Sequence, residues 1–171
     1  MAATPDLPLR VELVPGSCWY RNVRANVSPS TWARLQQMTF MPAKYRCQIC
    51  AGVGASHPVE CHEVWHYDDR LRVQTLRQLI ALCPRCHRVK HLGLALALGQ
   101  QDRIEDALAW FCSVNQVSPA IALAHIQAVF AEHAHRSSFR YQLDVGLLRQ
   151  YGIDLDSRGI ERGHVPTAID D

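Results

Sequence analysis

Four cysteines in two Cys-x-x-Cys pairs are the residues of this 171-residue chain whose spacing points most directly to a chemical role. Cys47 and Cys50 form the first pair, and Cys83 and Cys86 form the second. Four thiolates presented in two such pairs are the ligand set of a closed, tetrahedral structural zinc site. The sequence therefore predicts one structural Zn²⁺ bound by these four cysteines.

Three histidines form a second candidate ligand set, made of His62, His87 and His91. His87 and His91 are four residues apart in a segment whose composition favours a helix, so their side chains would share one helical face. A site of four thiolates does not need them, and we expect them to hold a second, catalytic divalent cation. The sequence does not decide between Mg²⁺, Mn²⁺, Ni²⁺ and Zn²⁺, since three imidazoles also suit the last two.

The composition is that of a soluble globular protein, with 48% hydrophobic and 20% charged residues. No apolar run approaches the ~20 residues of a membrane span, and the N-terminus does not have the pattern of a signal peptide. Paired Cys-x-x-Cys motifs without such a signal indicate metal binding in a reducing, cytoplasmic compartment. The remaining cysteines, Cys18, Cys61 and Cys112, are expected to be small buried apolar residues.

Charge is distributed unevenly along the chain, whose formal net charge is +2. Residues 1–100 carry 12 Lys/Arg and 6 Asp/Glu, a net +6, whereas residues 101–171 carry 6 Lys/Arg and 10 Asp/Glu, a net −4. The basic half contains the Cys and His motifs, as expected if that half meets a polyanion. This asymmetry is a weak indication of nucleic-acid binding, because solvated surface charge is an equally ordinary cause.

We expect an α+β fold, in which a small zinc-stapled ββα unit is flanked by α-helices. Its segments are an N-terminal arm and helix (1–43), the zinc-stapled module (44–98), a helical region (99–156) and a polar, disordered tail (157–171). The C-terminal helices are also a candidate surface for a protein partner or a second copy of the chain, and no membrane contact is expected.

Local patterns predict the elements of these segments. Ser28 and Pro29 are a helix N-cap and first helical residue, and this helix would end near Met41. Residues 59–66 have strand composition, Asp68-Asp69 is a turn signal, and residues 70–78 form a second strand or a loop. A helix is expected from Cys86 to about Leu98, and residues 99–151 look wholly helical.

Two short motifs overlap these residues and suggest other activities. His62-Glu63-Val64-Trp65-His66 matches the His-Glu-x-x-His string of zinc proteases, which needs both histidines one turn apart on a helix. The strand composition of this stretch argues against a helix. Cys83-Pro84-Arg85-Cys86-His87 matches the haem c attachment string, but that attachment belongs to exported proteins and leaves Cys47 and Cys50 without a role.

Taken together, the array resembles the HNH endonuclease family, the ββα-metal or His-Me finger nucleases, in its zinc-stapled form. The resemblance covers residues 47–91. It rests on the first Cys pair, the strand segment 59–63, and the apolar segment 79–82 that leads into Cys83-x-x-Cys86-His87-x-x-x-His91. The resemblance implies a ββα fold with a structural Zn²⁺ and one catalytic metal that promotes hydrolysis of phosphodiester bonds.

The resemblance also implies roles for single residues. In the family the first strand ends in a metal ligand followed by a histidine general base, so His62 would be the ligand and Glu63 would stand at the base position. His66, on the same strand face as His62, is a second candidate base. In the alternative register Cys61 is the ligand and His62 is the base, but a thiolate is a poor ligand for Mg²⁺ or Mn²⁺. The family's middle Asn, which orients the base, corresponds to Gln78.

Cationic side chains next to the motifs are candidates for contacts with nucleic-acid phosphates, which would give affinity with little dependence on sequence. They are Arg46, Arg85, Arg88 and Lys90. The expected function is thus a metal-dependent endonuclease that acts on nucleic acid, DNA in the first place. The alternative is a non-enzymatic zinc-ribbon protein that binds nucleic acid or serves as a scaffold.

Overall fold

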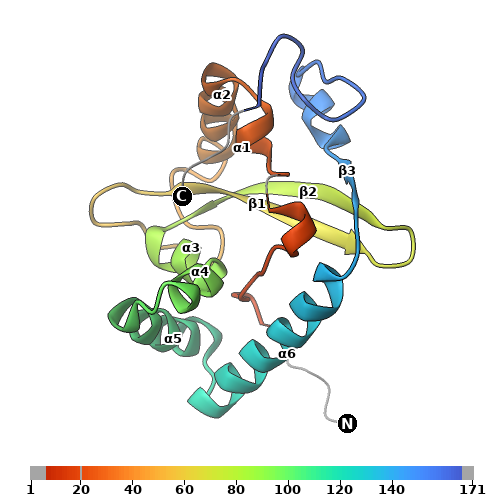
Figure 1. Cartoon of the computed structure of the whole chain (residues 1–171). Helices are drawn as coiled ribbons and strands as arrows, with labels where there is room; N and C mark the ends of the chain where they lie inside the picture. The colour runs from red at the N-terminus through yellow and green to blue at the C-terminus, as the bar shows by residue number, and fades with distance from the viewer. Residues whose placement is uncertain (1–6, 20, 167–171) are drawn as a thin grey trace.

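A long antiparallel hairpin runs through the middle of the molecule (Figure 1). In this computed structural model, which describes residues 7–19 and 21–166, the hairpin consists of β1 (Glu60–Asp68) and β2 (Val73–Leu82). The strand expected over residues 59–66 is therefore confirmed. Of the two alternatives for residues 70–78, the structure has a strand from Val73 onward, which continues to Leu82. Asp68 shapes the turn between them, because its Oδ1 accepts hydrogen bonds from the backbone N–H groups of Arg70 (2.9 Å) and Leu71 (2.7 Å).

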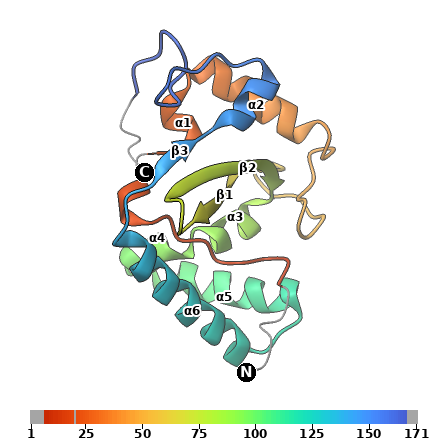
Figure 2. The ribbon, with the colours of Figure 1, turned by 90° about the vertical axis from the view of Figure 1, so that its right-hand side faces the viewer.

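β3 extends the hairpin into a three-stranded sheet, and the α-helices lie on its two faces (Figure 2). One side carries α1 and α2, and the other side carries α3 to α6. In chain order the elements outside the hairpin are η1 (Gly16–Cys18), α1 (Val23–Asn26), α2 (Pro29–Phe40), α3 (Pro84–Lys90), α4 (Leu92–Ala97), α5 (Gln101–Asn115), α6 (Pro119–Ser137), β3 (Gln142–Asp144) and η2 (Gly146–Tyr151).

Each face of the hairpin has its own apolar core. Ile80 and Leu82 of β2 pack with Val89 of α3, Leu92 of α4 and Phe111 of α5. The opposite core contains Cys61, Leu76 and Leu79 from the hairpin and Leu35 of α2. Neighbouring residues of a strand point to opposite faces, so the pairing register decides which side chains reach which core. The hairpin thus separates a face that packs against α3 from a face that packs against α2.

The start of α2 follows its sequence signals. Ser28 is the N-cap, and its hydroxyl accepts a hydrogen bond from the backbone N–H of Thr31 (3.3 Å). Pro29 occupies the first helical position, where a missing N–H costs nothing. The expected helix ending near Met41 is confirmed, since α2 ends at Phe40.

Three expectations about the C-terminal part need correction. The expected helix from Cys86 to Leu98 is two helices, α3 and α4, with His91 between them. Residues 99–151 are not wholly helical, because β3 pairs in parallel with the start of β2. Within the expected disordered tail, the segment around Glu161 is held to the fold: its carboxylate accepts hydrogen bonds from Ser28 N–H (2.6 Å) and the Thr31 hydroxyl (2.7 Å). Residues 167–171 lie outside the described residues.

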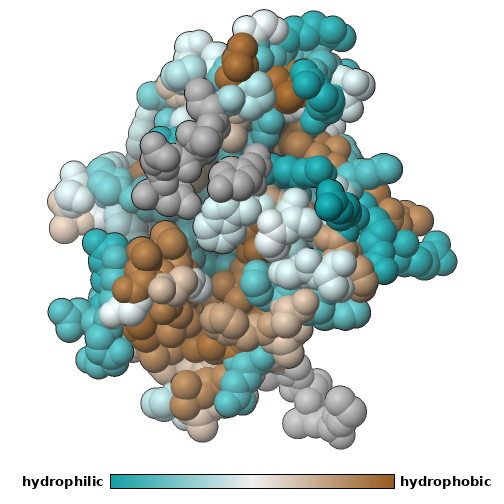
Figure 3. Space-filling view, in the orientation of Figure 1, coloured by the Kyte–Doolittle hydropathy of each residue, from teal (hydrophilic) through white to brown (hydrophobic). Residues whose placement is uncertain are grey.

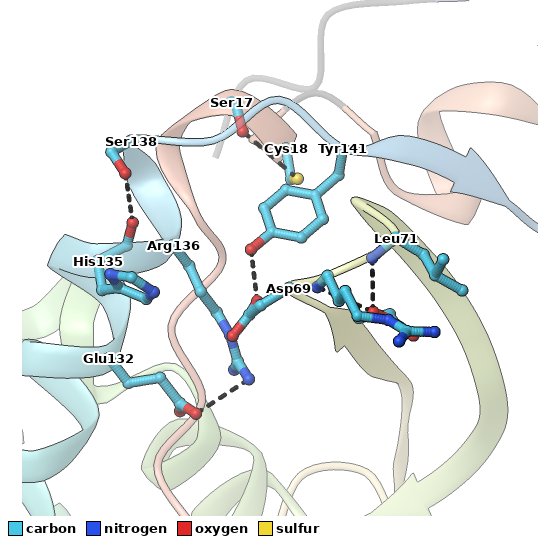
Figure 4. Close-up of polar contacts among 11 residues, drawn as sticks. Ser17, Cys18, Asp69, Leu71, Glu132, His135, Arg136, Ser138 and Tyr141 are labelled. Carbon is cyan, nitrogen blue, oxygen red and sulfur yellow. Dashed lines mark hydrogen bonds and ion pairs between the residues drawn. The ribbon is translucent and has the colours of Figure 1, made fainter.

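A polar cluster joins the tip of the hairpin to the end of α6 (Figure 4). Asp69 Oδ1 accepts hydrogen bonds from the hydroxyl of Tyr141 (2.7 Å) and from Nε of Arg136 (3.1 Å). Arg136 also pairs with Glu132 one turn earlier on α6, at 3.0 Å. The cluster therefore fixes the hairpin tip against α6 and the chain segment that leads into β3.

Apolar side chains are exposed on the helices farthest from α2. Figure 3 shows a brown surface over the lower part of the molecule, where α4, α5 and α6 lie in the view of Figure 1. The large exposed apolar residues of α4 and α6 and their connections are Leu94, Leu96, Leu98, Ile121, Leu123 and Phe130. The idea that these helices contact a partner or a second copy stays a prediction.

No helix in the described part of the chain is by itself long and apolar enough to cross a membrane. The pair α5 and α6 meets the length and composition criteria only jointly, and it is bent by 108° at the break between the two helices.

Candidate metal centre

The four cysteines of the two Cys-x-x-Cys pairs converge on one point. Their sulfur atoms all lie within 4.8 Å of one another, and the Sγ atoms of Cys50 and Cys83 are 3.6 Å apart. A tetrahedral zinc with Zn–S bonds of about 2.3 Å requires sulfur separations of ~3.8 Å. The cluster can thus hold a structural metal such as zinc, as the spacing predicted.

The first Cys pair sits on a loop that is tied to β2. Gln48 holds it from both sides: its backbone N–H donates to Ala81 O (2.9 Å), and its side-chain oxygen accepts from Ala81 N–H (2.8 Å). Gly54 lets the loop pass close to α3, because a Cβ there would lie 2.2 Å from the carbonyl oxygen of His57 and 2.5 Å from Cδ of Pro84. The second pair follows directly from β2 into α3, so both pairs are positioned by the same strand.

Nitrogen donors around the cluster suit thiolate ligands. The indole N–H of Trp110 on α5 lies 3.3 Å from Cys86 Sγ, and the backbone N–H of Cys50 lies 3.5 Å from Cys47 Sγ. Outer hydrogen bonds of this kind stabilise negative charge on metal-binding sulfur. Of the three other cysteines, Cys18 and Cys61 are buried as expected, and Cys112 is half-buried against the core.

The three histidines of the second candidate set also converge, from β1 and from the end of α3. His62, His87 and His91 each offer a nitrogen within 4.8 Å of the others, and Nε2 of His87 lies 3.1 Å from Nε2 of His91. Ring centroids are 5.2 Å apart for His62 and His87 and 4.6 Å apart for His87 and His91. Metal–nitrogen bonds of about 2.1 Å in a tetrahedral site place ligand nitrogens ~3.4 Å apart, so this donor set fits a transition metal.

Two carboxylates each form a hydrogen bond to one nitrogen of two of these rings. Nδ1 of His87 donates to Glu60 Oε2 at 2.5 Å, and Nε2 of His62 donates to Glu12 Oε2 at 2.8 Å. Glu60 also accepts from Nε2 of His57, at 2.7 Å. A carboxylate behind a metal-binding histidine fixes the tautomer and the ring orientation. Sequence reasoning missed both residues. Glu60 had a signal, because it shares a strand face with His62, whereas no spacing linked Glu12 to the site.

The surroundings favour neutral rings for His62 and His91 and ionised carboxylates for Glu12 and Glu60. Burial lowers the pKa of His62 despite the opposing effect of Glu12. Desolvation of the ring and then the neighbouring His87 and His62 lower the pKa of His91 to about 3, although that residue as a whole reaches the surface. The hydrogen bond from His87, against burial, lowers the pKa of Glu60 to about 2. For Glu12 burial acts upward, but His62 and Lys90 outweigh it and bring the pKa to about 2.

Glu63 does not belong to this site, so its assignment as general base is wrong. Its Oε1 accepts hydrogen bonds from the backbone N–H groups of Val23 (2.9 Å) and Arg24 (3.3 Å) at the start of α1, and its Oε2 accepts from the indole of Trp65 (3.1 Å). Burial raises the pKa of Glu63 to about 7, against the lowering effect of these three donors. The carboxylate thus faces the α2 side of the sheet, whereas His62 faces α3.

The alternative register and the protease motif fail for related reasons. Cys61 is buried on the α2 side, where its thiol lies 3.8 Å from the Thr39 hydroxyl, so it is no ligand partner for His87. Residues 62–66 lie within β1, so the helix that a His-Glu-x-x-His site requires is absent here. His66 is exposed, and four residues along a strand span about 13 Å, too far for a base acting beside His62.

Gln78 lies on the same face of the hairpin as His62. It pairs with Val64, two residues beyond the His62–Ile80 pair, so it shares the strand face of His62 and is exposed. Its orienting role stays a prediction, and its original partner in that role, Glu63, points away.

The cationic side chains proposed to contact phosphates differ in their exposure and in their ion pairing. Lys90 is 6% exposed and its ammonium contacts Glu12, so its assignment as a phosphate contact is wrong. Arg85 pairs with Asp106 at 2.6 Å and stacks over Trp110, and Arg88 lies 3.9 Å from the same carboxylate. Arg46 is exposed and donates to Ala51 O at 3.1 Å. Arg46, Arg85 and Arg88 remain candidate phosphate contacts at the surface.

Comparison with known proteins does not assign the chain to a family. No family model matches it, no curated protein matches it, and no solved structure matches it. The site must therefore be interpreted from its own geometry.

Proposed function

We propose that the chain is a metal-dependent endonuclease of the ββα type, which hydrolyses phosphodiester bonds of nucleic acid, DNA in the first place. The observation that carries the proposal is one juxtaposition. His62 of β1 faces His87 of α3, the helix that directly follows the hairpin, and His91 at the end of that helix. The four cysteines connect the same helix to the loop before the hairpin. This order of elements and ligands is the one that the resemblance to HNH nucleases implies.

The ligand number supports a catalytic role for the histidine site. Three protein ligands leave a tetrahedral metal one open position, which is typical of catalytic sites, whereas the four-cysteine set is closed. A divalent ion held there would supply a Lewis acid for the charge that develops on a phosphate under attack. The chain's own part is to hold this ion through His62, His87 and His91 and to orient two of the rings through Glu12 and Glu60.

The experiment is a plasmid-nicking assay with Mg²⁺, Mn²⁺, Ni²⁺ or Zn²⁺, with and without chelator. We expect His87→Ala to lose nearly all cleavage. His66→Ala is the matched control, because His66 lies on the same strand face but outside the cluster, and it should cleave at the wild-type rate. Equal cleavage by His87→Ala and the wild type, or cleavage that survives chelator, would contradict the proposal.

A second candidate function is favoured by the placement of Glu63 and Lys90. The residue at the family's base position caps α1, and the ammonium of Lys90 is paired with Glu12. Such an arrangement suits a non-enzymatic, metal-stapled protein that binds nucleic acid or serves as a scaffold. Cleavage of no duplex, branched or single-stranded substrate with any of the four metals would favour this function.

A further inference from the structure

We propose that the N-terminal arm, residues 7–15, is a working part of the metal centre, and that Glu12 is the positioning residue that makes Nδ1 of His62 its metal-binding atom. This inference rests on metal binding by the three histidines, the first element of the proposed function, and does not require that the chain cleave nucleic acid. The arm lies outside the 47–91 stretch on which the family resemblance rests.

The contact between the arm and the histidines is direct. Glu12 Oε2 accepts from Nε2 of His62 at 2.8 Å, Oε1 accepts from the Lys90 ammonium, and the backbone N–H of Glu12 donates to Lys90 O at 3.0 Å. One residue of the arm thus binds both β1 and the end of α3, the two elements that supply the histidines.

The hydrogen bond to Glu12 determines which nitrogen of His62 is available. A carboxylate only accepts hydrogen bonds, so Nε2 of His62 must carry the proton. In a neutral imidazole the lone pair then lies on Nδ1. His87 shows the opposite choice, because Glu60 accepts from its Nδ1 and its free Nε2 lies 3.1 Å from Nε2 of His91. Two carboxylates from different parts of the chain thus set complementary tautomers on two rings.

The arm is seated as a fixed element, although residues 7–15 form no helix or strand. Asn115 of α5 bonds both backbone groups of Leu9, with Oδ1 accepting from its N–H (3.0 Å) and Nδ2 donating to its carbonyl (2.8 Å). Nε2 of His125 on α6 accepts from Val11 N–H at 3.1 Å. Leu7, Leu9 and Val11 are each at most 4% exposed in the core under the hairpin. The helices α5 and α6 therefore hold the arm so that Glu12 reaches the site.

The start of α4 is shaped to the same arm. A Cβ on Gly93 would lie 2.2 Å from Cδ2 of Leu13, the residue after Glu12, so any larger residue there would have to displace the Leu13 side chain. Lys90 supplies the counter-charge that a half-buried carboxylate needs, since an unpaired charge in such a place is costly. Residues from α3, the start of α4, α5 and α6 thus converge on the arm around Glu12.

The test measures metal affinity in protein whose four-cysteine site is loaded with zinc, by titrating Co²⁺ and following its visible absorption bands. The comparison is Lys90→Met against the double variant Glu12→Leu/Lys90→Met. Neither variant leaves an unpaired ammonium, they differ only at residue 12, and leucine cannot accept the hydrogen bond from His62. We expect the double variant to bind Co²⁺ about 10–100-fold more weakly than Lys90→Met, the usual cost of losing an outer carboxylate. Glu105→Gln, which removes an exposed charge on α5, should bind Co²⁺ as the wild type does.

Two further measurements separate positioning from mere stability. Histidine ¹⁵N NMR of the Co²⁺-free, zinc-loaded protein should show His62 as the Nε2–H tautomer, and the double variant should lose this preference. Asn115→Ala keeps Glu12 but loosens the arm, so it should weaken Co²⁺ binding while thermal unfolding still shows one folded module.

Unchanged Co²⁺ affinity in the double variant, or an Nδ1–H tautomer of His62 in the wild type, would overturn the role of Glu12. Neither result depends on cleavage. Failure of the nuclease proposal would instead appear as tight Co²⁺ binding with no nicking, so the two ideas can fail separately.

Discussion

Glu63 and His62 are neighbours in the sequence, yet they serve opposite faces of the sheet: His62 faces α3, and Glu63 binds the first backbone N–H groups of α1. These two adjacent residues therefore have different roles. His62 belongs to the candidate metal centre, whereas Glu63 fixes the layer that contains α1 and α2.

Substitution of Glu63 should therefore affect stability and spare any cleavage. Glu63→Ala removes the acceptor for two backbone N–H groups and one indole, and we expect a loss of about 1–3 kcal/mol in the free energy of unfolding. Glu63→Gln keeps one acceptor and should lose less. Chemical denaturation measures both values. A nicking rate per folded molecule that drops by more than tenfold in Glu63→Gln, with metal still bound, would restore Glu63 as a catalytic residue.

The cluster of four cysteines should be essential for folding of the module. Binding of zinc by small structural sites is worth about 10–16 kcal/mol, so Cys47→Ala should unfold the segment that contains β2 and α3. Elemental analysis should find one tightly held zinc per chain in the wild type, and circular dichroism should show the loss in the variant. Cys112→Ala is the control, since Cys112 is half-buried outside the cluster. A native disulfide between Cys47 and Cys50 would be incompatible with this site.

The two glycines of the first Cys loop should respond differently to a methyl group. In Gly54→Ala the new Cβ meets backbone at 2.2 Å, so the loop must shift away from α3, at a cost of about 1–3 kcal/mol. In Gly52→Ala the nearest atom is Cys50 Sγ at 3.4 Å, which needs little adjustment. Thermal unfolding and the rate of zinc release to a chelator compare the two. Equal behaviour would mean that the close approach of loop and helix is not maintained in solution.

The polar cluster around Asp69 at the hairpin tip should make the thermal stability of the protein depend on pH in the acidic range. Burial acts upward on the pKa of Asp69, but hydrogen bonds from Tyr141 and Arg136 lower it overall, below the usual 3.8. A lowered pKa means that this stabilisation is complete above pH ~4 and is lost as the pH falls through the folded-state pKa. The midpoint of thermal unfolding should thus fall less steeply below pH 4 in Asp69→Asn than in the wild type. Identical slopes would exclude Asp69 as a contributor.

Much of the metal centre could be predicted because its ligands are close in sequence or lie at helical spacing. Cys83, Cys86, His87 and His91 belong to one turn-and-helix segment, so their relative positions follow from local geometry. The alternation of side chains along a strand could also have shown that Glu63 does not face the same site as His62. Once residues 59–66 are assigned to a strand, His62 and Glu63 cannot both face the metal, because neighbouring side chains alternate between faces.

Other features have no local signal. Glu12 reaches His62 across 50 residues through a segment without regular structure, and only tertiary packing of Leu9 and Val11 brings it there. β3 is three residues long and pairs in parallel with a distant strand, which leaves too few residues for an alternating pattern. Lys90 stands next to the motifs in the sequence, which makes it a candidate phosphate contact, but packing of the arm buries it against Glu12.

Cys86 and His87 are consecutive residues on the first turns of α3, and each belongs to a different candidate site. If both clusters bind metal as proposed, the two ions would share one helix as support, and we expect the thiolate site to fill first and align the helix that carries His87. Because such coupling is reciprocal in free energy, the second ion must in turn slow the escape of the first. On that proposal, a weak chelator should remove metal from the histidine site before it removes metal from the cysteine site.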